Sequence, residues 1–110
     1  MAGPGAGNAP SDSSDVAAHR YRKGRHFLDG DDPESASKAR DEFLAALNVD
    51  PMFARAWSGL SDAYEMLAYL AVLPPEEAHL RARAAAERAL ELDPDLAEAH
   101  VSLATVLLDY

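Results

Sequence analysis

Residues 46–57 read ALNVDPMFARAW, and residues 89–100 read ALELDPDLAEAH. Ala, Leu, Asp, Pro, Ala and Ala recur at matched places in the two stretches, and Pro51 and Pro94 are separated by 43 residues. Internal repetition with a period of about 20–50 residues is typical of proteins that stack copies of one small structural unit. The sequence therefore predicts a repeat architecture.

The composition limits the classes of function to which the chain can belong. At 110 residues it is one domain at most, with 48% hydrophobic and 26% charged residues, as in ordinary globular proteins. The absence of Cys excludes a disulfide framework, a Cys-based zinc finger and thiol catalysis. A net charge of −9 argues against nucleic acid as a partner, because that affinity comes largely from Lys and Arg.

No stretch of the sequence predicts insertion into a membrane or export. The longest apolar run, residues 66–73, is far shorter than the roughly 18 residues that span a bilayer. Residues 1–14 lack the basic start and apolar middle of a signal peptide, and they are rich in Gly, Pro, Ser and Asp. Such residues bury too little apolar surface to offset the entropy lost on ordering. We expect a disordered lead over residues 1–14 and a cytoplasmic protein with no membrane partner.

Helix signals recur along residues 15–110, whereas the period-2 alternation typical of strands is absent. Asp32-Pro33, Asp50-Pro51 and Asp93-Pro94 each predict a capping carboxylate followed by a proline at the first helical position. Pro75-Glu76-Glu77 predicts a similar start, with two acids at the positive end of the helix dipole. The expected fold is all-α, with five helices at about 15–29, 33–48, 51–70, 75–92 and 94–109.

A motif within these helices resembles the tetratricopeptide repeat (TPR), which follows W-x2-L-G-x2-Y, then A-x3-F, then P over 34 residues. Trp57-x2-Leu60-Ser61-x2-Tyr64 departs from the first part only by Ser for Gly. The resemblance implies a right-handed solenoid of antiparallel helix pairs over residues 15–110, in units of about 16–53, 54–96 and a partial 97–110. These two and a half repeats would pack through Phe27, Ala39, Phe43, Ala46, Pro51, Trp57, Leu60, Tyr64, Ala82, Ala89, Pro94 and Leu103. A generic Ala-rich helical bundle is the alternative.

The spacing of the repeats departs from the family pattern. The period of 43 residues exceeds 34, and the additional residues lie between Tyr64 and Ala82. Together with the PPEEA stretch in this insertion, the repeat resembles the TPR segment of bacterial signalling proteins such as winged-helix regulators and adenylate cyclases. A sensory or assembly segment of such a larger protein is therefore an alternative function. In those proteins the third unit continues into another helix, so we expect the chain to be a fragment or a very short array.

Stacked helical pairs curve, and the first helix of each pair lines the concave side. The inward positions expected from the motif include Tyr21, Arg22, Arg25, Arg55, Ser58, Asp62, Glu65, Glu98, Val101 and Ser102. The same count from the motif also places Ala18, Leu28, Asp29, Gly59, Met66, Thr105 and Leu108 on this side. This surface would run from cationic to acidic, and an acidic-tailed peptide held by Arg22, Arg25 and Arg55 is one hypothesis. A second copy of the chain, bound through the last helix or through Leu67–Leu73, is another.

Nothing in the sequence predicts catalysis. Glu76-x-x-His79 has the spacing of a di-iron ligand pair, but a di-iron site needs a second such pair, which is absent. The glycines at positions 3, 5 and 7 follow no predicted strand, so they do not form a phosphate loop. We therefore expect a non-catalytic protein–protein interaction module with no cofactor and no metal.

Overall fold

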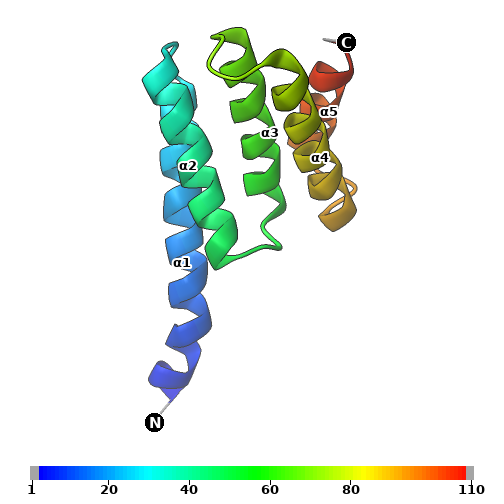
Figure 1. Ribbon diagram of the computed structural model, residues 1–110. Coiled ribbons are helices and arrows are strands. Elements are labelled where there is room, and N and C mark those ends of the chain that lie inside the picture. The colour runs from blue at the N-terminus through cyan, green and yellow to red at the C-terminus, as the bar shows by residue number, and fades with distance from the viewer. Residues whose placement is uncertain (1–2, 109–110) are drawn as a thin grey trace.

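The computed structural model describes residues 3–108, with side chains from Ser14 onward, and this range contains helices and no strand (Figure 1). The prediction of an all-α fold with five helices is thereby confirmed for the described residues. The helices are α1 (Gly3–Leu28), α2 (Pro33–Val49), α3 (Ala54–Tyr69), α4 (Pro75–Leu92) and α5 (Ala97–Leu108).

The first helix begins earlier than predicted. Helical backbone starts at Gly3, whereas the composition predicted a disordered lead over residues 1–14 and a helix from about residue 15. Residues 1 and 2 lie outside the described residues.

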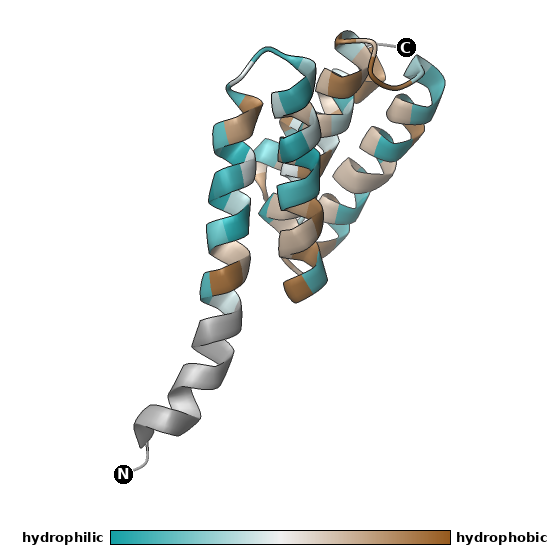
Figure 2. Ribbon diagram, turned by 60° about the vertical axis from the view of Figure 1, so that its left-hand side comes forward, coloured by the Kyte–Doolittle hydropathy of each residue, from teal (hydrophilic) through white to brown (hydrophobic). Residues whose placement is uncertain are grey.

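The helices form two antiparallel pairs followed by a single helix. α1 packs against α2, α3 packs against α4, and α5 packs against both α3 and α4 (Figure 1). α3 also contacts α1 and α2, whereas α2 and α4 do not touch each other in the described part of the chain. One layer therefore contains α1, α3 and α5, and the other contains α2 and α4. Figure 2 shows hydrophilic and hydrophobic residues alternating along each coloured helix, as expected for amphipathic helices.

The capping prediction for Asp32 is confirmed. Asp32 is the N-cap of α2, its Oδ1 accepts a hydrogen bond from the Ser35 amide at 2.8 Å, and Pro33 is the first helical residue. This arrangement satisfies one of the backbone donors left unpaired at the start of a helix. Hydrogen bonds from the amide and hydroxyl of Ser35 hold the pKa of the Asp32 carboxyl below its ordinary value.

The same prediction is wrong for Asp50 and Asp93. Both are C-caps of the preceding helices, and the next helices begin three residues after each proline, at Ala54 and Ala97. Each Asp carboxylate instead accepts from the backbone amide two residues further on, at 3.1 and 3.2 Å. Because Asp can close such a turn with its own side chain, the Asp-Pro pair ends one helix and the start of the next is delayed.

These two turns are equivalent at the level of individual hydrogen bonds. Trp57 donates from Nε1 to the carbonyl oxygen of Pro51 at 2.8 Å. His100, which is 43 residues after Trp57, donates from Nε2 to the carbonyl oxygen of Pro94 at 2.7 Å. The repeat seen in the sequence is therefore also a repeat of the turn structure.

The largest fully buried side chain is Phe43 of α2, which is 0% exposed. Its ring lies between Gly24 of α1 and Gly59 of α3, and a Cβ atom added at either glycine would fall within 2.6 Å of the ring. The absence of side chains at these two positions lets α1 and α3 approach α2 closely. Phe43 thereby joins the first helical pair to the second.

The remaining predicted packing residues fall into three groups. The buried ones, with Phe43, are Ala39, Ala46, Leu60, Tyr64, Ala82 and Ala89. The partly buried ones are Phe27, Trp57 and Leu103. Pro51 and Pro94 are exposed, because they lie in the turns described above.

Leu67–Leu73 is neither wholly core nor wholly surface. Leu67 is buried and Leu73 is partly buried against the core, whereas Tyr69 and Val72 are exposed. α3 ends in this segment because Ala71 takes a left-handed backbone conformation with φ 61°, and the Val72 amide donates back to the Leu67 carbonyl at 2.8 Å. This is the hydrogen-bond pattern of a Schellman cap, which reverses the chain between α3 and α4.

Candidate functional site

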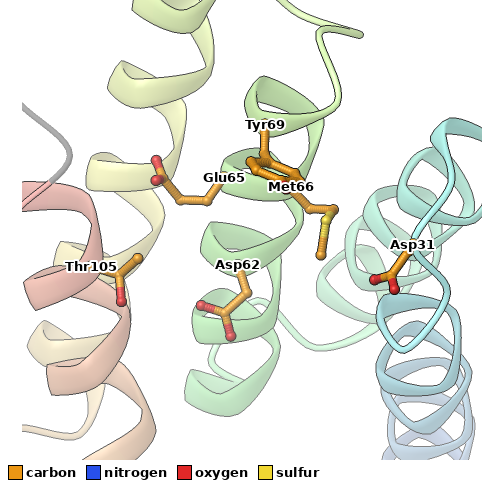
Figure 3. Close-up of a pocket in the computed structure, with 6 residues that line it drawn as sticks. All are labelled: Asp31, Asp62, Glu65, Met66, Tyr69 and Thr105. Carbon is orange, nitrogen blue, oxygen red and sulfur yellow. The ribbon is translucent and has the colours of Figure 1, made fainter.

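Two adjoining hollows open on the layer of α1, α3 and α5. One has a volume of about 320 Å³ and is lined by Asp31, Asp62, Glu65, Met66, Tyr69 and Thr105. The other has a volume of about 280 Å³ and is lined by Arg25, Asp62, Ala97, Glu98 and Val101. The two share Asp62, and we refer to these ten residues together as the groove. Figure 3 shows Asp62 and Met66 on α3, between Asp31 on one side and Thr105 on the other.

A chain of hydrogen bonds fixes the centre of the groove. Ser102 of α5 donates to Asp62 Oδ1 at 2.7 Å, and the Ser58 and Ser102 hydroxyl oxygens lie 2.9 Å apart. On the other side, Arg25 Nη1 of α1 lies 3.3 Å from Asp62 Oδ2. Asp62 therefore links all three helices of this layer.

The structure brings together five of the ten predicted groove residues as lining residues: Arg25, Asp62, Glu65, Glu98 and Val101. Arg55 stands beside them, with its Nε 3.4 Å from Glu98 Oε2. Arg22 is exposed on α1, but it does not line either hollow.

Of the other three predicted groove residues, Ser58 and Ser102 are buried and Tyr21 is partly buried against the core. Ser58 and Ser102 are 1% and 2% exposed, so their hydroxyls hold α3 against α5 and cannot reach a ligand. Tyr21 packs its ring on Phe43 and Phe53, with ring centroids 5.8 and 5.2 Å apart. These predictions were wrong because the motif identifies the inward side of each helix without showing how closely the helices meet.

Sequence reasoning missed three residues of the groove, Asp31, Tyr69 and Ala97. Tyr69 follows Asp62 and Glu65 at helical spacing on the same face of α3, so continuing the period by one turn would have found it. Asp31 lies in the loop between α1 and α2 and lines the groove from the side opposite Thr105. No periodic signal predicts its position.

The groove is predominantly acidic. Its lining contains four carboxylates, from Asp31, Asp62, Glu65 and Glu98, and one cationic side chain, from Arg25. Arg25 already faces Asp62, and Arg55 already faces Glu98. Two of the three arginines that would have held an acidic peptide therefore face carboxylates of the chain itself.

Burial raises the pKa of the Asp62 carboxyl, although the hydrogen bond from Ser102 and the charge of Arg25 act in the opposite direction. A carboxyl with a raised pKa binds its proton more tightly in the folded chain than in the unfolded chain. Between the ordinary value of 3.8 and the higher folded value, a rise in pH therefore favours unfolding at this site.

This pH dependence can be tested with Asp62→Asn. We expect the wild-type chain to lose stability relative to the variant as the pH rises from 3.8 through the folded pKa of Asp62. The measurement is urea unfolding of both proteins across a pH series, with Asp41→Asn at an exposed position of α2 as the control for loss of one carboxylate. A free-energy difference that moves in favour of the wild type over this range would contradict the expectation.

The described residues contain no group of three or more His, Asp or Glu side chains placed to hold a metal ion. Within the same range, every helix is too short or too polar to cross a membrane. What the groove offers chemically is a concave surface of carboxylates beside the apolar side chains of Met66, Tyr69 and Val101.

A scan of the chain against protein-family models gives no match, and a search of the curated proteins finds no similar sequence.

Proposed function

We propose that the chain is a non-catalytic interaction module, built as a right-handed solenoid of about two and a half TPR-like repeats, and that its groove binds a segment of another protein. The matched hydrogen bonds of the two Asp-Pro turns support the repeat arrangement, because a generic bundle has no reason to reproduce them. The layer of α1, α3 and α5 corresponds to the concave side of such a solenoid.

The observation that carries the proposal is the excess of carboxylates in the groove. Its four carboxylates outnumber the two cationic side chains that face them, those of Arg25 and Arg55, so the surface that meets a ligand is acidic. Electrostatic complementarity favours a cationic partner on such a surface and disfavours an acidic one. Tyr69, which is exposed, and Met66 add apolar area beside these carboxylates. The ligand is therefore a basic segment that also carries apolar side chains, and not an acidic tail.

The test compares two fluorescein-labelled peptides, one of alternating lysine and leucine and one of alternating glutamate and leucine. We expect the lysine peptide to bind at least about tenfold more tightly by fluorescence anisotropy, a difference of about 1.4 kcal/mol. Added salt should weaken this binding, because the attraction is between exposed charges. Equal binding of the two peptides, or tighter binding of the glutamate peptide, would count against the proposal.

A charge-reversal variant locates the binding. Asp31→Lys combined with Glu98→Lys adds cations at both ends of the groove, and we expect it to weaken the lysine peptide about tenfold or more. Asp41→Lys combined with Glu87→Lys is the matched control, since it makes the same change of net charge at two exposed positions outside the groove. If the control weakens binding as much as the groove variant, the attraction comes from net charge and the groove is not the site.

A further inference from the structure

α5 carries an exposed apolar surface that no described element covers. Its buried side is formed by Ala99, Ser102 and Val106. The opposite side presents Val101, which is 66% exposed, and Leu108, which is 85% exposed, with Leu107 and Ala104 beside them. We refer to Val101, Ala104, Leu107 and Leu108 as the α5 patch.

Acids outnumber cations near this patch, although Arg55 pairs with Glu98 and Arg25 lines the same hollow as Val101. The sequence contains no Lys or Arg after Arg88, whereas it contains five acids, among them Asp95 and Glu98 near the start of α5. An exposed apolar surface with polar residues at its border is typical of an interaction site. Its partner surface must be apolar and cationic.

A surface of that kind exists on the opposite layer of the same chain. Between α2 and α4, which do not touch, lies a hollow of about 390 Å³ with α3 as its floor. Trp57, Leu60 and Tyr64 of α3 form an aromatic and aliphatic floor, and Leu44 of α2 stands at the edge. We refer to this as the α2–α4 hollow; the residues that line it on α4 are Arg81, Ala84, Ala85 and Arg88.

The two arginines are the charged residues of this hollow, and no carboxylate lines it. Arg81 lies over the Tyr64 ring, 6.0 Å from its centroid. Arg81 and Arg88 also pair with Glu77 and Glu91 of their own helix, at 3.3 and 3.0 Å. Such exposed pairs within one helix contribute little, so the guanidinium groups can turn toward a partner's carboxylates.

We infer that the α5 patch of one copy docks into the α2–α4 hollow of a second copy. The apolar side chains of the patch enter the apolar floor, and the acids around α5 face Arg81 and Arg88. A second copy is the occupant because the chain itself supplies both halves, which are complementary in polarity and charge. The interface is heterologous, so a dimer keeps one free hollow on the first copy and one free patch on the second, and the assembly grows as a ring or a filament.

Sedimentation velocity over a concentration series tests this inference with two variants. Ala104→Asp combined with Leu108→Asp places two carboxylates in the α5 patch, at exposed positions outside the groove. Arg81→Glu with Arg88→Glu reverses the charge of the hollow, and Arg83→Glu, on α4 outside the hollow, is the matched control. We expect the wild type and Arg83→Glu to associate with rising concentration, and each double variant to associate at least about tenfold more weakly.

Mixing the two double variants gives the decisive result. Each retains the half that the other lacks, so an equimolar mixture should form dimers that do not grow further. A wild type that is monomeric at about 1 mM, and so has a Kd above that concentration, overturns the inference. So does a mixture that stays monomeric while the wild type associates, since the interface would then be isologous. Neither double variant alters a groove residue, so failure here leaves lysine-peptide binding as a separate result.

Discussion

Phe43→Ala lowers the free energy of unfolding by about 3–5 kcal/mol, the range for removal of a large aromatic side chain from a packed core. Phe43 is 0% exposed, and its ring touches the glycines of two different helices, α1 and α3. The cavity left by the ring cannot be filled by backbone movement of one helix alone. Since chains of this size have total stabilities of about 5–15 kcal/mol, the variant loses a large part of its stability.

Urea unfolding followed by circular dichroism at 222 nm measures this loss. The matched control is Leu44→Ala, one residue further along α2, where the side chain is 42% exposed and its removal leaves no closed cavity. We expect the control to change the free energy of unfolding by about 1 kcal/mol or less. Similar losses in the two variants would mean that Phe43 does not hold the helical pairs together.

Gly59→Ala is the second substitution for which we expect a large effect. We expect it to lower the free energy of unfolding, whereas a typical Gly→Ala change within a helix raises it. Alanine ordinarily stabilises a helix by about 1 kcal/mol relative to glycine. Here the added Cβ would lie 2.5 Å from Cε1 of the Phe43 ring, which is enclosed on its other side by Gly24. Overpacking of this kind costs about 1–3 kcal/mol, so we expect net destabilisation.

A double-mutant cycle isolates the cause. In a Phe43→Leu background the aromatic ring is absent, so Gly59→Ala should destabilise the chain less than it does in the wild type. The expected coupling is about 0.5–3 kcal/mol, as for residues in direct contact. The measurement is urea unfolding of the four proteins. If the two changes are additive, Gly59 is not constrained by the Phe43 ring.

Apart from the start of α1, the helical pattern was predictable from sequence to within a few residues. α4 begins at Pro75 and ends at Leu92, as expected, and α2 differs from its predicted range only at its last residue. The starts of α3 and α5 were predicted three residues too early, because Asp-Pro is compatible with either a helix cap or a turn. The choice between the two depends on Trp57 and His100, whose ring nitrogens bind the proline carbonyls.

The groove was only half predictable, and for a different reason. Helical spacing predicted Asp62, Glu65 and Val101 on one surface, and these three residues line the two hollows. The same spacing placed Ser58 and Ser102 there, although these residues are buried between α3 and α5. Small polar side chains recur with the same periodicity whether they lie at helix contacts or at helix surfaces. The sequence pattern therefore does not distinguish the two cases, and only the distance between the packed helices does.

The sequence by itself determined the helical content and the 43-residue repeat. Both depend on hydrogen bonds and side-chain patterns among residues that are close together in the chain. Such patterns can be recognised from the order of the residues without knowing how the helices pack. The tertiary structure alone decided the charge of the groove. Arg25 meets Asp62 across 37 residues, and Ser102 meets Asp62 across 40. These pairs form only when α1, α3 and α5 pack side by side, which is why a surface expected to begin as cationic is acidic.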